Sequence, residues 1–579
     1  MAPSIVHLPN GQTLTVTPVF GGLYFKSNDL NTHHSVFPPG WTIILNCEDE
    51  EEDHTNPAAS VHAHTHPISE IDRAGMPKRQ HIHRFRKPSL QNDHLYISSI
   101  SNPSSSDFRP SSSPTRGIAM MLWASLWWYF HQPEPERQLT TPASAGTPEE
   151  GRPKGEWRVN INREGIFQGK HLFPKLERMG LIATEDSSVG LDPEDGVRNA
   201  GEGWERMFVS RKSFWQLDPR IYLFTLSPTQ DSSPYPSVSP ASSRPASPNR
   251  GTDRTTPTPN LSMTARNTGG DALSAMASTM AGPPHPLSRH NTPPGPYAST
   301  SNLPTFYPPP PLQFIFTNGT RHPVRPKPPR QGETFYTRYI PSLGQYLSFR
   351  VASLSHSPCI HRGPTSTFSG EQQTTDARFS RQMDTSIPTI AAMNLTNLKN
   401  RENGDATEDT MCMTDVELLH KWMNDPRVSH SWAEDGPMSH QKSFLQTNLG
   451  DRHSFPAIGC FDGKPFGYFE LYWVKEDKLS QQVDGSSVGD WDRGIHCLVG
   501  EQELRGAHRV KVWLSALVHY CWLADLRTER VFMEPRVDNT LVKRYCEEAG
   551  FFKEGEIAFP HKQSNLLTIK REGWEAPAI

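Results

Sequence analysis

The chain has no surplus of basic residues, because 58 Lys and Arg face 62 Asp and Glu and leave a net charge of −4. A general nucleic-acid binder carries a basic surface, so we expect no nucleic-acid partner. The seven cysteines show no paired spacing, and no signal peptide opens the chain, which favours a reducing, intracellular setting. The last residues, Ala576–Ile579, are not a peroxisomal tripeptide, so we expect a cytoplasmic protein.

Long apolar runs are also missing. The densest one, Gly117–Phe130, is shorter than the about 20 residues that cross a bilayer, so we expect a buried core helix and no membrane partner. The His-rich stretch at residues 62–66 lacks the carboxylates or cysteines of a metal framework. We therefore expect no bound metal.

Apolar residues make up only 35% of the 579 residues, whereas proline is abundant. Residues 228–311 hold 19 of the 54 prolines, among Ser, Thr and Asn. Such a composition cannot bury enough surface to offset its ordering entropy. We expect a disordered linker at 227–311, a disordered insertion at 355–410 and a weak acidic, His-rich loop at 48–79.

The N-terminal part, residues 1–226, has apolar patterns of its own and is predicted to form an α+β domain. Helices are expected at Gly117–Phe130 and Gly169–Gly180. Strands are expected at Thr13–Val19, Trp41–Leu45, His94–Ile100, Trp157–Ile161 and Ile221–Leu226.

The C-terminal part is predicted to be a mixed sheet flanked by helices, which places the chain in the α+β or α/β class. Residues 312–354 supply connecting strands and a first strand at Gln345–Ala352, and the domain itself spans 411–575. An Asp462-Gly463 turn predicts a hairpin, and Asp538 or Asn539 can cap a helix that stops at Gly550. The expected elements are a helix from Asp415, strands Phe455–Cys460 and Pro465–Val474, helix His508–Leu526, strand Val531–Met533, helix Thr540–Ala549, and strands near Glu554–Ala558 and Leu566–Lys570.

One stretch of this part carries chemistry. An apolar strand pattern contains His496 and ends in a short turn, and the long helix pattern opens behind that turn. A turn at a helix N-terminus presents free backbone N–H groups and the positive end of the helix dipole, which suit a pyrophosphate. A histidine one strand away can handle a proton. This combination is what an acyl-CoA transferase requires.

The order of the motifs resembles the GNAT acyltransferases. They are similar to the siderophore branch, the aerobactin/mycobactin-type lysine acyltransferases, and most of all to the fungal N5-hydroxyornithine acyltransferases. The resemblance spans about residues 411–575, under a third of the chain. The matching stretches are HKWMNDPRV at 420–428, GYFELYW at 467–473, DWDRGIH at 490–496, RGAHRV at 505–510 and EPRVDN at 534–539.

The resemblance implies a transfer of acetyl from acetyl-CoA to the hydroxylamine of N5-hydroxy-L-ornithine, with His496 and Glu534 as catalytic residues and no metal. It also implies that the N-terminal half is a degenerate, noncatalytic domain of the same kind, and that the partners are a second copy of the chain and siderophore peptide synthetases. The acceptor pocket is expected at Trp432, Glu434, Asp492 and Arg493. Coenzyme A is expected at Cys497, Leu498, Arg505, Gly506, Ala507, His508, Arg509, Val510 and Asn539.

The sequence departs from the general GNAT pattern at two places. The small-residue positions of the phosphate loop hold His508 and Val510, so a Cβ must fit where glycine leaves room. The usual tyrosine acid falls at Cys546, which leaves Tyr545, Cys546 or water as the acid. An anhydromevalonyl-type transfer, a lysine N6-acyltransferase and a noncatalytic acyl-CoA-binding scaffold remain as alternatives.

Overall fold

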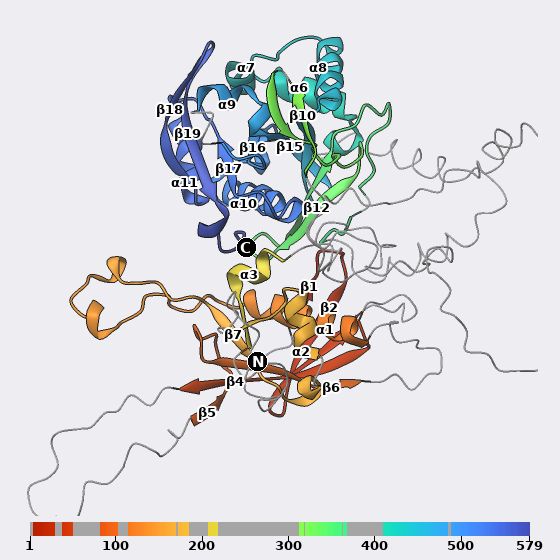
Figure 1. Cartoon of the computed structure of the whole chain (residues 1–579). Coiled ribbons are helices and arrows are strands. Elements are labelled where there is room, and N and C mark those ends of the chain that lie inside the picture. The colour runs from red at the N-terminus through yellow and green to blue at the C-terminus, as the bar shows by residue number, and fades with distance from the viewer. Residues whose placement is uncertain are drawn as a thin grey trace, which may run out of the picture.

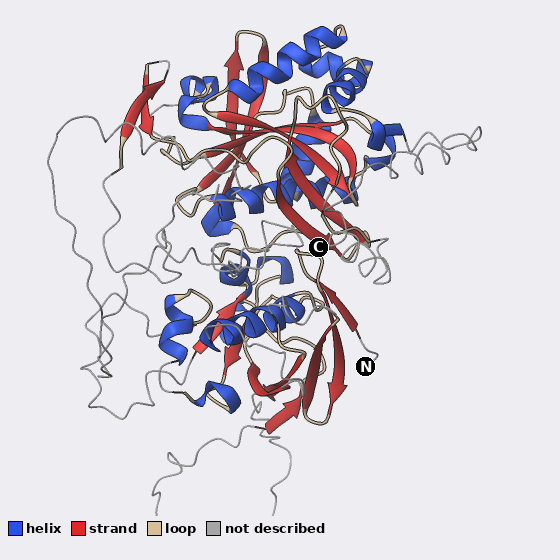
Figure 2. Ribbon diagram, turned by 90° about the vertical axis from the view of Figure 1, so that its right-hand side faces the viewer, coloured by secondary structure: helices blue, strands red, loops and turns tan. Residues whose placement is uncertain are grey.

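The computed structural model describes two sheet-centred halves, stacked one above the other in Figures 1 and 2. The predicted linker 227–311, the strand at Ile221–Leu226, and most of 48–79 and 355–410 lie outside the described residues. The described residues are 4–28, 37–49, 81–101, 114–169, 172–184, 207–217, 312–317, 319–361, 363–366, 409–483 and 488–579.

The N-terminal sheet has the strand order β1-β2-β3-β4-β6-β7-β9-β8, with β5 paired to β4. Its helix α1 (Pro114–Phe130) confirms the predicted core helix, because almost every side chain from Ala119 to Phe130 is buried. The strands are β1 (Ser4–His7), β2 (Thr13–Val19), β3 (Gly22–Ser27), β4 (Gly40–Asp49), β5 (His81–Arg84), β6 (Asp93–Ser101), β7 (Arg158–Ile161), β8 (Ala183–Thr184) and β9 (Met207–Ser210). The short helices are η3 (Gly165–Gln168), α2 (Leu172–Arg178) and α3 (Arg211–Trp215).

The C-terminal sheet has the order β12-β13-β14-β15-β16-β17-β19-β18, beside a separate β10-β11 hairpin. Its first strand is therefore β12, one strand before the expected Gln345–Ala352. The strands are β10 (Phe314–Thr317), β11 (Thr320–Pro323), β12 (Thr334–Ile340), β13 (Gln345–Val351), β14 (Ser454–Phe461), β15 (Lys464–Trp473), β16 (Arg493–Val499), β17 (Arg530–Met533), β18 (Phe552–Phe559) and β19 (Lys562–Lys570). The helices are α6 (Asp415–Met423), α7 (Pro426–Trp432), α8 (Met438–Gly450), α9 (Lys478–Gln482), α10 (Ala507–Ala524) and α11 (Thr540–Glu548).

Local sequence signals explain several of these boundaries. Asp462 and Gly463 both have positive φ, +47° and +82°, which is the backbone of the two-residue turn that matches strand twist, so the predicted hairpin is confirmed. Asn539 caps α11 by accepting a hydrogen bond from the Val542 amide at 3.2 Å. Gly550 follows α11 with φ +99° and ends it as expected.

The sheet opens between β16 and β17. These parallel strands pair only at Arg493↔Val531 and Gly494↔Phe532, whereas β16 pairs with β15 along its whole length. From Ile495 onward, the edge of β16 that faces β17 therefore carries backbone groups without a strand partner. This gap lies between the strand ends and the start of α10.

The two halves contact each other through α3, α10 and the residues after β19 (Figure 1). On α10, His519 lies 2.7 Å from the Trp215 carbonyl oxygen and 2.9 Å from the Tyr336 hydroxyl. Gln216 donates to the Trp574 carbonyl at 3.0 Å. The halves are thus joined by hydrogen bonds, of which the one between His519 and Trp215 is buried, as well as by the chain.

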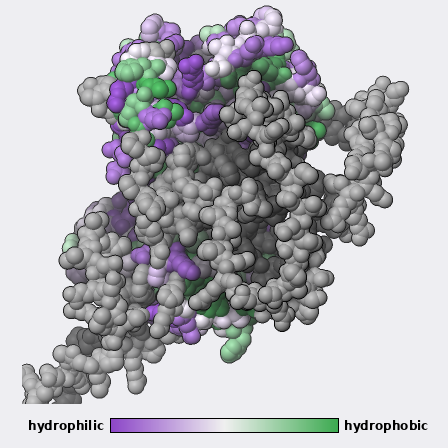
Figure 3. Space-filling view, turned by 45° about the vertical axis from the view of Figure 1, so that its right-hand side comes forward, coloured by the Kyte–Doolittle hydropathy of each residue, from purple (hydrophilic) through white to green (hydrophobic). Residues whose placement is uncertain are grey.

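The described surface gives two further observations. No helix among the described residues combines the length and the hydrophobicity needed to cross a membrane. On the face shown in Figure 3, the described surface of the upper, C-terminal half is mostly hydrophilic, with small hydrophobic patches.

Candidate active site

His496 lies on β16 between two carboxylates. Its Nδ1 is 2.8 Å from Glu470 Oε2, and its Nε2 is 2.7 Å from Glu534 Oε1. Ionised carboxylates only accept hydrogen bonds, so both ring nitrogens must donate and the ring is an imidazolium. Burial lowers the pKa of His496, but Glu534 and Glu470 outweigh it and raise the pKa to about 10. A histidine that donates from both ring nitrogens has no lone pair left for a proton, so this geometry favours His496 as a proton donor.

Glu534 directly follows β17 and is held on both sides. Its second oxygen accepts from Lys562 at 2.6 Å. Burial alone would raise the pKa of Glu534, but His496 and Lys562 outweigh this effect and lower the pKa to about 2. Two carboxylates and two cations thus form a cluster of Glu470, His496, Glu534 and Lys562 that is neutral as a whole.

Glu470 was not among the predicted site residues. It stands directly opposite His496 in the β15–β16 register, and its other oxygen accepts from Asn448 of α8 at 3.0 Å and from the Tyr468 hydroxyl at 2.9 Å. The sequence signal was present in the GYFELYW stretch, but a strand register across a long connection is needed to pair it with His496. Lys562 was missed for the same reason.

Aromatic rings form the walls around this cluster. Tyr472 packs on the His496 ring with centroids 4.6 Å apart, and Trp432 approaches it edge-on at 6.4 Å. Ala433 ends α7 with φ +53°, and the next residue, Glu434, lies 2.9 Å from His440 Nε2. The structure therefore brings Trp432 to His496 and places Glu434 at the adjoining loop.

The expected phosphate turn is at the start of α10. Gly506 has φ +133°, and a Cβ there would strike the His508 ring, so this position requires glycine. The Arg509 and Val510 amides both bond to the Gly506 carbonyl at 3.0 Å. Among the described residues, the preceding amides at Gly506, Ala507 and His508 have no hydrogen-bond acceptor, which leaves donors for phosphate oxygens.

The arginines of this turn do not point at that cradle. Arg505 donates through Nη2 to the Val499 carbonyl at 2.7 Å, and Arg509 donates to Gln345 at 3.0 Å. The phosphate donors that the structure offers are therefore backbone amides, and Arg505 braces the turn.

Helix α6 fixes the turn from the other side. Glu501 is buried, accepts from Trp422 Nε1 at 2.6 Å and is 2.9 Å from Lys421 Nζ. A Cβ on Gly500 would collide with the Trp422 ring, so the turn and α6 are in close contact. These anchors lie in the HKWMNDPRV stretch, to which we had given no role.

Three further predicted residues, Asn539, Cys546 and Tyr545, lie on or next to helix α11. Asn539 uses its side chain as the cap of α11, and Cys546 is buried against Met533, its Sγ 3.6 Å from the Met533 Sδ. Burial raises the pKa of Cys546 well above its usual range, so it is a poor proton donor. Tyr545, on the same helix, is half-buried beside Arg544.

Asp492 and Arg493 are not brought to His496. Asp492 is buried and accepts from Arg530 at 2.7 Å. Arg493 is three positions from His496, and because strand side chains alternate, it projects from the opposite face of β16, beside Trp473. The structure thus places Trp432 beside His496 and Glu434 in the loop after α7, and it places Asp492 and Arg493 away from His496.

Comparisons with known proteins agree with this geometry. Residues 411–559 match the model of the acetyltransferase (GNAT) domain family. The chain is 43% identical to the N5-hydroxyornithine acetylase sidL of Beauveria bassiana (strain ARSEF 2860), over 97% of this chain and 100% of that protein. The chain belongs to the siderophore-biosynthesis branch of the GNAT acyltransferases. As a member of it, the protein is an acyl-CoA-dependent N-acyltransferase.

More distant members of this GNAT branch match over shorter spans. An N(6)-hydroxylysine O-acetyltransferase of Escherichia coli is 42% identical over 28% of this chain and 50% of its own length. The N(5)-hydroxyornithine:cis-anhydromevalonyl coenzyme A-N(5)-transacylase SIDF of Beauveria bassiana is 29% identical over 48% of this chain and 52% of its own length. The chain thus spans about half the length of these two relatives.

Proposed function

We propose that this GNAT enzyme transfers the acetyl group of acetyl-CoA to the side-chain hydroxylamine of N5-hydroxy-L-ornithine. The observation that carries the proposal is the partly buried, neutral cluster of Glu470, His496, Glu534 and Lys562 beside the β16–β17 gap. The product is a hydroxamate, a bidentate oxygen ligand for ferric iron. The 43% identity to a whole N5-hydroxyornithine acetylase supports this acceptor.

The cluster supplies both proton transfers. The acceptor nitrogen attacks the thioester carbonyl, so a C–N bond forms, and the C–S bond breaks as the tetrahedral intermediate collapses. We assign removal of the nitrogen-bound proton to Glu470, because Glu534 is paired with Lys562 and has a pKa of about 2. His496 gives its proton to the departing thiolate. The proton on Glu470 then returns to His496 across their 2.8 Å contact.

Backbone amides complete the proposed site. The open edge of β16 at Cys497 and Leu498 faces the gap, where amide hydrogens can polarise the thioester carbonyl. The free amides at Gly506, Ala507 and His508 receive the pyrophosphate of coenzyme A. Trp432 and Glu434 border the acceptor.

The charge balance favours a hydroxylamine over an amine. An ornithine ammonium has a pKa near that of lysine, about 10.4, so about three units separate it from its nucleophilic form at pH 7. The two carboxylates of the cluster are already paired with His496 and Lys562, so neither is free to hold such a cation. A hydroxylamine is much less basic and arrives neutral.

The test is a thiol-release assay with acetyl-CoA and longer acyl-CoAs against N5-hydroxyornithine, ornithine and N6-hydroxylysine. We expect the highest kcat/KM for acetyl-CoA with N5-hydroxyornithine. Equal or faster acylation of ornithine would defeat the hydroxamate proposal. Preference for a longer acyl-CoA or for N6-hydroxylysine would move the enzyme to the reactions named for its more distant relatives.

The setting of the reaction is also proposed. All seven cysteines are free thiols, which supports a reducing compartment, and we place the enzyme in the cytoplasm. A homodimer and contact with a siderophore peptide synthetase remain predictions.

A further inference from the structure

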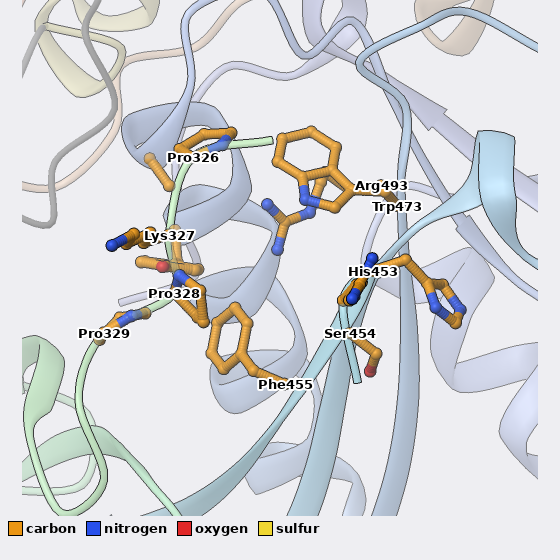
Figure 4. Close-up of a pocket in the computed structure, with 12 residues that line it drawn as sticks. Pro326, Lys327, Pro328, Pro329, His453, Ser454, Phe455, Trp473 and Arg493 are labelled. Atoms are coloured by element: carbon orange, nitrogen blue, oxygen red, sulfur yellow. The ribbon is translucent and has the colours of Figure 1, made fainter. Parts of the chain in front are cut away.

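A second concave site lies on the opposite face of β16 from His496. Arg493 and Trp473 form one wall of this pocket, and the chain at Pro326–Pro329 forms the other (Figure 4). Arg493 is only 4% exposed. In Figure 4 its guanidinium lies beside the Trp473 ring and is directed toward the Pro326–Pro328 stretch.

Arg493 has donors without acceptors. Within the described part of the chain, its Nε and Nη2 are buried and have no hydrogen-bond partner. Leaving buried charged donors unpaired is costly, because water has been removed and nothing replaces it. These two nitrogens form the edge of the guanidinium that binds the two oxygens of a carboxylate or phosphate side by side.

A neighbouring arginine shows what this edge does when it has a partner. Arg325 also packs on Trp473, with its guanidinium carbon 4.6 Å from the ring centroid. Its Nε and Nη2 each bind one oxygen of Glu476 at 2.6 Å. Arg493 lies 4.1 Å from the same ring and has the same edge free. Arg325 therefore has a carboxylate partner at this edge, whereas Arg493 has none among the described residues.

The rest of the lining has the matching charge. Lys327 and Arg452 are exposed at the rim, and His453 is held protonated between Asp451 and Asp477. Burial lowers the pKa of His453, but these two carboxylates raise it to about 9. No carboxylate is among the residues that line the pocket. The exposed rim of the pocket therefore carries the positive charges of Lys327 and Arg452, whereas the charge of His453 is balanced by Asp451 and Asp477.

We propose that this pocket, centred on Arg493, binds a small oxyanion, a carboxylate or a phosphate, separately from the acyl-CoA site. The oxyanion accepts from Nε and Nη2 of Arg493 and is attracted by Lys327 and Arg452. Its place on the far face of β16 lets it bind while acyl-CoA occupies the β16–β17 gap.

The experiment is calorimetry of the full chain saturated with coenzyme A, so that the α10 turn is already filled. Inorganic phosphate and acetate are titrated at matched ionic strength, with chloride as the control. We expect one site per chain for at least one of the two anions, and the preferred anion identifies the source. Arg493→Lys keeps the positive charge and removes the two parallel N–H donors of the guanidinium. We expect the Kd for the preferred anion to rise about tenfold or more.

Two further variants keep the test decisive. Arg544→Lys makes the same change at an exposed arginine of α11, and it should leave the Kd unchanged. Lys327→Ala alters only an exposed lining residue, so it decides the question if Arg493→Lys does not fold, and we expect weaker binding by a few-fold. No binding of either anion to the wild type, or binding equal in Arg493→Lys, would overturn the proposal.

Discussion

The two halves of the molecule have the same sheet and different chemistry. Strand for strand, β1-β2-β3-β4-β6-β7-β9-β8 corresponds to β12-β13-β14-β15-β16-β17-β19-β18. In each half a single parallel pair, β6–β7 or β16–β17, interrupts an otherwise antiparallel sheet, and a long helix connects its two strands. This shared topology supports the interpretation of the N-terminal half as a degenerate domain of the same kind.

One difference between the halves is an insertion. In the C-terminal half, helices α6, α7 and α8 separate β13 from β14, and they contribute Trp422, Trp432 and Asn448 to the site. In the N-terminal half, a turn at Phe20 and Gly21 joins β2 directly to β3. Among the described residues, only the C-terminal half therefore has helices inserted between these two strands to cover the sheet face that carries His496.

The gap between the parallel strands is the other difference. After β7, Gly165 approaches β6 so closely that an added Cβ would overlap the Ile97 carbonyl oxygen, and Phe167 is fully buried behind it. After β17, the chain turns instead toward β19, where the Val537 amide bonds to Gln563 at 3.0 Å. In the N-terminal half the chain after β7 fills the space beside β6, whereas in the C-terminal half the corresponding edge of β16 stays open. Function thus comes from what is added to the fold, not from the fold itself.

The largest expected effect comes from removing the chemistry of the C-terminal half. His496→Gln should lower kcat about 10²-fold or more, because it removes the acid to which we assign protonation of the thiolate. Coenzyme A binding, measured by calorimetry, should persist. Tyr96→Phe on β6, the corresponding strand of the other half, is the control change and should leave kcat/KM unaltered. Near-wild-type turnover of His496→Gln from pH 6 to 9 would remove the histidine from the mechanism.

A side-chain atom added at Gly165, which fills the space beside β6, should lower the stability of the fold but not the activity. Gly165 has φ +55° and no room for a Cβ, so Gly165→Ala should destabilise the fold by about 2 kcal/mol. A thermal melt would show this as a lower Tm. At temperatures where the variant is folded, its Kd for coenzyme A should equal that of the wild type. Weaker coenzyme A binding would mean that the N-terminal cleft takes part in binding.

How far the sequence predicts this molecule depends on how local each signal is. The hairpin at Asp462-Gly463 and the capped helix from Thr540 were found because turns and caps are written in adjacent residues. Strand β12 was not placed by itself, although it forms a local hairpin with β13. His496 and Glu534 were found through motifs.

The site residues that were missed or misplaced follow the same distinction. Glu470 and Lys562 reach His496 and Glu534 only through strand pairing across long connections. The position of Arg493 on the opposite face of β16 from His496 could be read from the sequence, because strand side chains alternate with period two.

A smaller effect is expected on the pH dependence of folding stability, to which His496 and His131 should contribute with opposite signs. The pKa of His496 is raised to about 10 from an ordinary 6.5. Its ionic contacts therefore stabilise the fold fully below about pH 6.5, and this contribution is lost as pH rises toward 10. His131 is the opposite case, since burial lowers its pKa to about 3, only partly offset by the Trp127 carbonyl. Stability tied to neutral His131 is present above about pH 6.5 and is lost as pH falls toward 3.

These signs are checked by thermal melts across pH. The Tm difference between wild type and His496→Gln should shrink from pH 6.5 to 10. The difference for His131→Gln should shrink from pH 6.5 downward. Parallel trends in the two variants would contradict the opposite charge states that we assign to these histidines.

The smallest effect is expected from the chain between the halves. Residues 227–311 contribute no periodic apolar pattern, and the halves already hold each other through His519 with Trp215 and Gln216 with Trp574. For a flexible segment, each halving of length changes the closure free energy by only about 0.6 kcal/mol. Replacing 228–311 with a Gly/Ser linker long enough to join the same ends should leave kcat/KM within a few-fold and the Tm nearly unchanged. Gln216→Ala in the linker-replaced chain should lower the Tm more than the replacement itself, because it removes a contact between the halves. Loss of soluble protein after the replacement alone would show that this segment contributes to the fold and that its composition misled us.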